Sequence, residues 1–294
     1  MRFEKWQALG NDYLIVERSE LPFALSPGRV RRICDPHFGV GSDGILLLSE
    51  PAEPQDVADL RIFNPDGSEA ELSGNGAREA ILYLRHRGWT DADRFSIGTP
   101  AGRVRPTITG PDTCSVDMGV ASLASEDFPG GPPDGRGRIG VDGHQWDFHH
   151  VSIGNPQCSI GLASREELEQ LDLGRVGPPI CEDPRFPNRT NVSWYVELAG
   201  AGSSGQPARI RARIFERGVG ETLSSGTGAS GAAVAYVEDQ PPRPGSATVV
   251  VSLDGGELEV EVGEDLQVTL TGWARPVFSG RLSEDLVKEL HETE

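Results

Sequence analysis

The alternation of apolar and polar positions predicts many short strands and few helices. Apolar or alternating runs bounded by Gly, Pro, Asn and Asp are typical of strands, whereas apolar positions three and four residues apart indicate helices. A short helix is expected over 27–34 and a terminal amphipathic helix over 283–292. We expect strands over residues 1–17 (interrupted at 10–12), 45–48 and 60–63, and a three-stranded meander over 247–271.

Two segments, 75–86 and 229–237, read as helices that are apolar on most sides. In the first, Ala77, Ala80 and Leu84 share one face, and its neighbours extend the apolar surface. A helix of this kind is usually buried. We therefore expect two central helices wrapped by strands, with 121–140 as a linker or long surface loop and 199–207 as a hairpin tip.

Each central helix is preceded by nearly the same five residues. Ser73-Gly74-Asn75-Gly76-Ala77 and Ser225-Gly226-Thr227-Gly228-Ala229 both place a hydroxyl before a Gly-X-Gly turn. Such a helix start presents unpaired N–H groups and the positive end of the helix dipole, which together attract an anion. Two anion-binding helix starts in one chain predict two similar halves and a small acidic ligand.

Composition narrows the function. The chain has 294 residues with 27 basic and 45 acidic side chains, a formal net charge of −18. Such a charge repels nucleic-acid phosphates, so nucleic-acid binding is not expected. We see no signal peptide and no run long enough to span a membrane. The four cysteines lack CxxC spacing, so neither a zinc site nor a disulfide framework is indicated, and a cytoplasmic protein is expected.

Taken together, the ordered motifs resemble the diaminopimelate epimerase family over nearly the whole chain. Any one of them alone would be a weak signal. The matching stretches are Gly10-Asn11-Asp12, Cys34-Asp35 through Gly44, Asn64-Pro65-Asp66-Gly67-Ser68, Gly74-Asn75-Gly76-Ala77-Arg78, Gly154-Asn155-Pro156, Thr190-Asn191-Val192, Glu216-Arg217-Gly218-Val219-Gly220-Glu221-Thr222 and Gly226-Thr227-Gly228-Ala229.

The resemblance implies an α+β fold of two pseudo-symmetric halves, each a curved β-sheet wrapped around a central helix, with the active site between them. We expect one half at 1–119, to which 276–294 returns, and the other at 120–275. Members of that family invert an α-carbon without pyridoxal phosphate or metal, so no cofactor and no metal are expected. Dimers are frequent in the family, which makes a homodimer possible for this chain.

The family uses two cysteines to move the proton, and their places fall on Ser73 and Ser225. Further cysteines are frequent in the same motifs of the family, where this chain has Glu79 and Ser230, and Gln157 stands where the family has a histidine. A hydroxyl is a far weaker acid than a thiol and needs a neighbouring base. Exchange of a proton on both faces of an unactivated carbon is therefore not expected.

Carboxylates are the candidates for moving a proton. Glu216 leads, because the resemblance places it beside the second catalytic position; the alternative is that it pairs with Arg217 or a backbone amide. Glu79 is the second candidate, although a solvated or salt-bridged helix residue is the favoured interpretation. Ser73 and Ser225 are expected to contact the ligand or relay a proton, and also to cap their helices.

The remaining candidate residues are considered for binding the ligand. Backbone N–H groups near Gly74, Asn75, Gly226 and Thr227 resemble those that hold the reacting carboxylate. Asn64, Asn155, Asn191 and Arg217 resemble the family's binders of the far end. Asn11 either contacts the ligand or only shapes its turn, and Gln157 either binds the ligand or replaces a core histidine. His37 is interpreted as a turn residue, and Cys34 and Cys158 as small core residues.

These observations favour an isomerase that moves one proton on a small amino or imino acid without a cofactor. A 1,3-proton shift needs one base on one face, and the related phenazine-biosynthesis isomerases use an acidic residue. A role in making 4-alkyl-proline units of antibiotics is one expectation. The alternatives are an epimerase or racemase, a lyase or dehydratase that needs one base, and a non-catalytic homologue that binds an amino acid.

Overall fold

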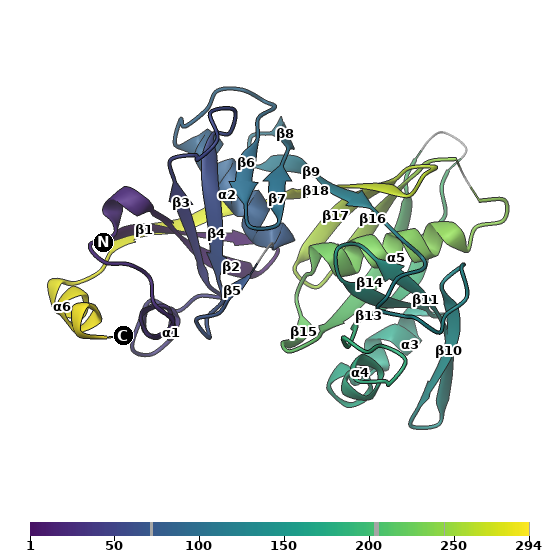
Figure 1. Cartoon of the computed structure of the whole chain (residues 1–294). Coiled ribbons are helices and arrows are strands. Elements are labelled where there is room, and N and C mark those ends of the chain that lie inside the picture. Colours follow the sequence, from purple (N-terminus) through teal and green to yellow (C-terminus); the bar gives the residue numbers. More distant parts are fainter. Residues whose placement is uncertain (71–72, 203–205, 244, 294) are drawn as a thin grey trace. The chain divides into compact units, whose positions relative to one another are not determined.

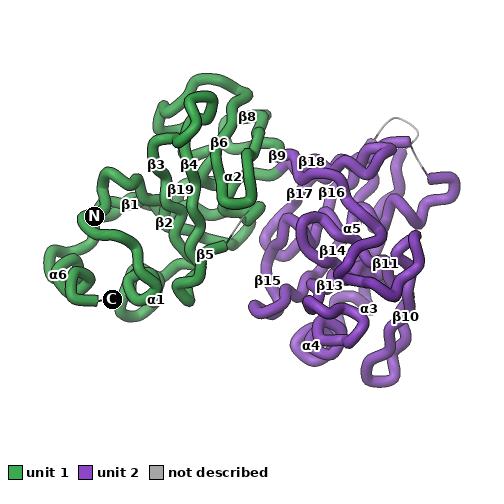
Figure 2. Tube along the Cα trace, viewed as in Figure 1, with its two compact units in different colours: residues 1–116, 272–294 green, residues 117–271 purple. Residues whose placement is uncertain are grey.

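The chain divides into two compact units. The structure, a computed structural model, describes residues 1–70, 73–202, 206–243 and 245–293. One unit comprises residues 1–116 and 272–294, and the other residues 117–271 (Figure 2). The boundaries lie within β9 (Thr113–Val120) and β18 (Gln267–Trp273), a few residues from the expected 119/120 and 275/276.

The first unit is a sheet around one central helix (Figure 1). The sheet has the order β19-β1-β2-β3-β4-β6-β7, with β5 paired to β4. Its strands are β1 (Arg2–Ala8), β2 (Asn11–Glu17), β3 (Ile45–Ser49), β4 (Ala58–Phe63), β5 (Glu69–Ala70), β6 (Ile97–Thr99), β7 (Gly102–Val104) and β19 (Arg275–Arg281), and its helices are η1 (Arg18–Glu20), α1 (Pro27–Cys34), α2 (Gly74–His86) and α6 (Glu284–Glu292).

Helix α2 is buried because apolar side chains surround nearly all of it. Every residue from Asn75 to Leu84 is buried, and the strands of the sheet supply the surrounding core. The chain reaches β2 through a two-residue turn at Leu9 and Gly10, both with positive φ, so Asn11 already belongs to the strand. This arrangement places the start of α2 near β2 and the loop before β3.

The second unit repeats the plan with a larger sheet. The order is β10-β11-β12-β13-β14-β16-β17-β18-β9-β8, with β15 paired to β14. The strands are β8 (Pro106–Gly110, which belongs to the first unit), β9, β10 (Arg136–Val141), β11 (His144–Ser152), β12 (Pro156–Gly161), β13 (Asn191–Ala199), β14 (Ala208–Glu216), β15 (Gly220–Thr222), β16 (Ala247–Leu253), β17 (Gly256–Val262) and β18, and the helices are α3 (Arg165–Gln170), α4 (Leu173–Cys181) and α5 (Gly226–Glu238).

Helix α5 lies along one face of this sheet (Figure 1). Small residues from Gly226 to Val237 allow the helix to approach the strands closely, and the largest part of its surface is buried. Phe148, Trp194 and Phe215 pack with α3 and α4 in a separate core cluster. The expected central helices and the α+β class are therefore confirmed, as is the meander, which is β16, β17 and β18.

Two expectations from the sequence need correction or qualification. The stretch 121–140 is not a loop throughout, because Arg136–Val141 forms β10 and Phe128 packs in the core. Gly and Pro before residue 136 hid a strand that depends on β11 for its hydrogen bonds. The expected hairpin tip at 199–207 lies between β13 and β14, and its residues 203–205 are outside the described part.

No helix within the described ranges is both long and apolar enough to cross a membrane.

Candidate active site

Ser225 caps α5 and also contacts a carboxylate. Its backbone is extended (φ −143°, ψ 124°), and its Oγ accepts a hydrogen bond from the Gly228 N–H at 3.2 Å. The same hydroxyl donates to Oε2 of Glu216 at 3.1 Å. Position 228 requires glycine, since a Cβ there would lie 2.8 Å from the Ile214 side chain. The predicted cap is confirmed, and it holds a hydroxyl against a candidate base.

Glu216 ends β14, directly opposite Gly220 of β15. Burial raises the pKa of this carboxyl above its usual value, while the hydroxyls of Thr222 and Ser225 act in the opposite direction. Ser225 is the defined partner, because Thr222 Oγ1 makes no hydrogen bond of ordinary geometry within the described residues. The alternative partners considered from the sequence, Arg217 and a backbone amide, are not those found in the described chain.

Beside the start of α5, three side chains form a chain of hydrogen bonds. Gln157 Nε2 donates to Asn155 Oδ1 at 2.6 Å, and Asn155 Nδ2 donates to Thr227 Oγ1 at 3.3 Å. Gln157 is fully buried and packs against Gly231, where a Cβ would come within 2.9 Å of its Cβ and Cγ. The amide of Gln157 thus orients Asn155 at the helix start.

Arg217 is positioned by its own backbone. Asn191 Oδ1 accepts the Arg217 N–H at 2.9 Å, and the guanidinium Nη1 donates to the Asn188 carbonyl at 2.7 Å. Asn191 is buried, whereas Arg217 is half-buried. The guanidinium carries five N–H donors in a planar fork, so this placement suits a ligand carboxylate.

Among the described residues, the start of α2 repeats the cap but has no carboxylate bonded to its serine. Ser73 Oγ accepts from the Gly76 N–H at 3.1 Å, and its other contact is the Tyr13 hydroxyl at 3.4 Å. Arg78 is fully buried one turn below and donates to the Gly74 carbonyl at 3.1 Å and to Asn75 Oδ1. A buried guanidinium beside the positive end of the helix dipole strengthens the attraction for an anion.

Asn11 has a partner that fits its turn interpretation, and Asn64 forms a hydrogen bond within its own turn. Asn11 Nδ2 donates to Asp43 Oδ2 at 2.7 Å, and the Asp12 N–H reaches the same oxygen at 2.9 Å. Asn64 Nδ2 donates to Ser68 Oγ at 2.9 Å. Their roles toward a ligand stay predictions.

The interpretation favoured from the sequence, that Glu79 is a solvated or salt-bridged helix residue, is wrong. Its side chain is 0 % exposed, and neither carboxylate oxygen has a hydrogen bond of ordinary geometry among the described residues. Burial raises its pKa well above the usual value; the neighbouring Arg78 opposes this, and Asp12 and Asp43 reinforce it. The helix angle alone could not show that strands enclose this side of α2.

Three residues at the two helix starts were not among the sequence candidates. Tyr13 reaches Ser73 across 60 positions, and no local signal announces it. Arg78 lies within a recognised motif, so its position was visible, but its burial was not. Thr222 lies in the motif that contains Glu216. Ser230, by contrast, donates to the Gly226 carbonyl at 2.8 Å inside its own helix.

The two cysteines that the sequence placed in the core, Cys34 and Cys158, take no part in the hydrogen bonds described at the two helix starts. Cys34 and Cys158 are buried, as expected of core residues, and burial raises the pKa of both thiols, that of Cys34 to about 11. A thiol with a raised pKa is a poor nucleophile and a poor base at neutral pH. His37 is exposed and its N–H is bound by Asp35 Oδ1 at 2.8 Å, in keeping with a turn residue. Within the described chain, no group of three or more His, Cys, Asp or Glu is arranged to hold a metal ion.

Comparison with known proteins agrees with this geometry. Two solved structures share the fold: a phenazine biosynthesis protein of the PhzF family from Bacillus anthracis (TM-score 0.68, 18% identity, covering 96% of this chain and 99% of that one) and a methylitaconate-delta-isomerase (TM-score 0.62, 12% identity, covering 98% and 97%). At 18% and 12% identity, these likenesses show that this chain shares its fold with both proteins.

The particular family follows from the sequence comparison. The family model described as diaminopimelate epimerase matches residues 3–124 and 149–277. A relative named diaminopimelate epimerase from Synechococcus sp. (strain JA-3-3Ab) is 39% identical over 292 residues, which cover 97% of this chain and 99% of the relative. The chain belongs to the diaminopimelate epimerase family.

Proposed function

We propose that this chain is a cofactor-independent isomerase that moves one proton on a small anionic amino or imino acid, with Glu216 as the base. The observation that supports it is the difference between the two helix starts. Ser225 touches a half-buried carboxylate at 3.1 Å, whereas Ser73 touches a phenol at 3.4 Å. A single carboxylate, Glu216, suits a proton shift in which the same base removes the proton and returns it.

The chemistry balances without a redox step. Glu216, ionised, takes a proton from a carbon next to a C=C or C=N bond of the ligand, and the electron pair moves into the conjugated system. The same carboxylic acid then returns the proton to the far carbon, and the double bond has shifted. A raised pKa makes the carboxylate a stronger base toward an already acidified carbon.

The start of α5 supplies the electrostatic help that this step needs. Its first N–H groups carry partial positive charge and are suited to a ligand carboxylate, or to negative charge that develops on it as the proton leaves. The Ser225 hydroxyl holds the Glu216 side chain in place by donating a hydrogen bond to it. It can do so before and after the ligand has lost its proton. Asn155 and Arg217 would bind the rest of the ligand.

One structural neighbour is named methylitaconate-delta-isomerase, a name that describes a double-bond shift. This supports the proposal that the fold can carry out such a reaction. The names of the relatives and structural neighbours do not refer to 4-alkyl-proline units, so the proposed substrate is the broader class of amino and imino acids. This substrate class rests on the anion-binding helix starts and on Arg217.

The test follows solvent deuterium into the ligand. The protein is incubated in D2O with a panel of small amino and imino acids that includes conjugated imino acids and diaminopimelate, and label is located by NMR. We expect label at a conjugated position or internal proton transfer in a conjugated ligand. Glu216→Gln should reduce turnover by about 10²- to 10⁴-fold while ligand binding is retained, and the exposed Glu259→Gln should behave as wild type.

A second function is favoured by sequence identity. The 39% identity to a protein named diaminopimelate epimerase supports amino-acid epimerisation. In that case label enters the α-carbon of diaminopimelate with interconversion of its stereoisomers, and the one-base proposal fails. Tight binding of a ligand with no exchange in any member of the panel would instead indicate a non-catalytic homologue.

A further inference from the structure

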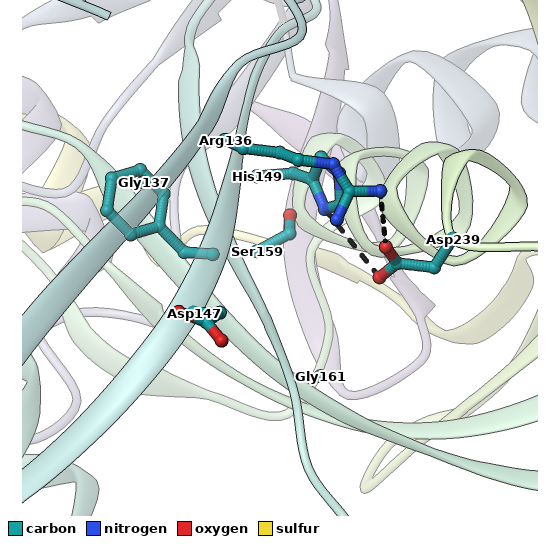
Figure 3. A pocket seen from close by; sticks show the side chains of 8 residues that line it. Arg136, Gly137, Asp147, His149, Ser159, Gly161 and Asp239 are labelled. Atoms are coloured by element: carbon teal, nitrogen blue, oxygen red, sulfur yellow. Dashed lines mark hydrogen bonds and ion pairs between the residues drawn. The ribbon is translucent and has the colours of Figure 1, made fainter. Parts of the chain in front are cut away.

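The second unit contains a hollow of about 480 Å³ that none of the candidate site residues lines. It lies beyond the carboxyl end of α5, next to the C-cap Asp239, whereas Ser225 caps the other end. A helix of 13 residues is about 20 Å long, so Asp239 at the hollow and the Ser225 cap lie at opposite ends of α5, while Ser159 and Gln157 both approach Gly231 in its middle. Residues of β10, β11 and β12 line the hollow, among them Gly137, His149 and Ser159 (Figure 3).

Two buried polar atoms at this hollow have no partner. His149 and Ser159 are direct cross-strand neighbours on β11 and β12, so their side chains share one face of the sheet. His149 is 4 % exposed and Ser159 is 0 % exposed, yet neither His149 Nε2 nor Ser159 Oγ has a hydrogen bond within the described residues. Polar atoms left unpaired in the interior are costly, so a pair of them beside a cavity points to a missing ligand.

The other nitrogen of His149 decides what Nε2 can do. Nδ1 lies 3.7 Å from Asp239 Oδ2, and Asp239 is held in turn by Arg136 Nη2 at 2.8 Å (Figure 3). A carboxylate near Nδ1 favours the tautomer with the proton there, which leaves Nε2 as an acceptor. Burial lowers the pKa of His149, so the ring is neutral near pH 7.

Ser159, His149 and Asp239 are the residue types of a catalytic triad, but their arrangement does not activate Ser159 as a nucleophile. Ser159 lies in the middle of a strand that is paired on both sides, by β11 and by β13. The N–H groups around it are therefore used by the sheet, and none is aimed at an oxyanion. The hydroxyl and the ring also lack a mutual hydrogen bond. Binding is the role that this geometry supports.

The charge around the hollow favours a cation. Three acidic side chains near the hollow, Asp134, Asp147 and Asp239, accompany two guanidiniums, whereas Glu238 is held by Arg243. Both guanidiniums are already paired, Arg138 with Asp147 at 2.7 Å and Arg136 with Asp239. The acceptors that remain are His149 Nε2, Ser159 Oγ and carboxylate oxygens, and an ammonium group has three N–H donors to match them.

The corresponding hollow of the first unit provides a contrast. It measures about 590 Å³ and lies by the end of α2, with Tyr83 and Arg87 on its wall. There the Tyr83 hydroxyl donates to Glu17 at 2.8 Å, and Arg87 forms an ion pair with Glu4. Those polar groups already have partners in the protein, whereas His149 Nε2 and Ser159 Oγ have none among the described residues.

We propose that the hollow formed by His149, Ser159 and Asp239 binds a small primary ammonium group, either of a free amine or at the end of an amino acid. Gly161 of the lining leaves room for it, since a Cβ there would lie 3.3 Å from the Tyr195 hydroxyl. The ammonium donates to Nε2, to Oγ and to a carboxylate. This site is independent of the proposed isomerase activity.

The experiment uses the full chain and ethylammonium as the probe. Imidazole ¹⁵N signals are followed by NMR during titration, and the His149 signals are assigned by their loss in His149→Gln. We expect a saturable shift of Nε2 with ethylammonium, and none with ethanol or acetate at equal ionic strength. Ser159→Ala should weaken binding at least tenfold, and Asp239→Asn should weaken it further.

Ser159→Ala removes an unpaired hydroxyl and is expected to fold, which keeps the test informative if Asp239→Asn does not. The exposed Glu259→Gln serves as the matched control and should bind as wild type. A stronger shift with acetate, an equal shift with ethanol, or unchanged binding in Ser159→Ala overturns the proposal. The readout is binding and not activity, so failure of this site and failure of the isomerase assignment are distinguishable.

Discussion

The Ser225 hydroxyl bridges the first turn of α5 and the carboxylate of Glu216: it accepts from the Gly228 N–H at 3.2 Å and donates to Glu216 Oε2 at 3.1 Å. Ser73 makes the same cap with Gly76, and its side-chain partner in the described part of the chain is Tyr13 and not a carboxylate. Two local sequences that are nearly identical therefore give two different chemical environments. We expect the two serines to differ in their effect on proton transfer and to agree in their effect on stability.

The pH dependence of turnover should report Glu216. Burial raises the pKa of this carboxyl, and only its ionised form accepts a proton, so kcat/KM should rise with pH through a value above the usual one for glutamate. Ser225→Ala removes a donor that lowers this pKa, so the acid limb should move to higher pH. In Ser73→Ala the limb should stay in place, because no carboxylate of the described residues contacts Ser73. Equal shifts in both variants would contradict the assignment.

Both serines should contribute to stability through their caps. Replacement of an N-cap serine by alanine costs about 0.5–2 kcal/mol, and each Oγ accepts one N–H of its helix. Ser73→Ala and Ser225→Ala should each lower the free energy of unfolding by about 1 kcal/mol, measured in urea. Together with the pH profiles, this separates the shared structural role from the role of Ser225 alone. A variant as stable as wild type would count against the cap.

Glu79 should destabilise the fold increasingly as pH rises. Its folded-state pKa lies well above the usual value, so the folded protein keeps a proton that the unfolded chain releases. Stability is therefore lost as pH increases between the two pKa values. Glu79→Gln cannot ionise, and its advantage over wild type should grow as pH rises above the usual pKa of glutamate, by about 1.4 kcal/mol for each pKa unit that separates the two states.

Urea unfolding at several pH values measures this effect, with the exposed Glu259→Gln as the control that should show no such trend. An advantage that stays constant with pH would mean that Arg78 keeps Glu79 ionised in the folded state.

The close approach of α5 to β12 should make position 231 intolerant of a side chain. A Cβ on Gly231 would lie 2.9 Å from Gln157 Cβ and Cγ. Gly231→Ala should cost about 1–3 kcal/mol and displace Gln157, which orients Asn155, so ligand affinity should fall as well. Gly130→Ala, where a Cβ meets nothing within 4 Å, is the control. Unchanged stability and affinity in Gly231→Ala would show that Gln157 has room to move.

The order of elements was predictable because the signals for it are local. A cap joins residues three positions apart, and the Ser-Gly-X-Gly pattern therefore predicted both helix starts, although α5 begins at Gly226, before the expected 229. The meander was predictable for the same reason, since turn residues separate its strands. Strand β10 was missed because its pairing with β11, and not its own composition, makes it a strand.

The candidate site was predicted as a set of residues but not as an arrangement. The sequence by itself determined the family motifs, the two caps and the replacement of thiols by hydroxyls. Only the tertiary structure decided that Ser225 faces Glu216 while Ser73 faces Tyr13, that Glu79 is enclosed, and that His149 and Ser159 share one face. The reason is physical: capping is satisfied within one helical turn, whereas burial and strand register depend on segments far apart in the chain, whose contacts exist only once the sheet has formed.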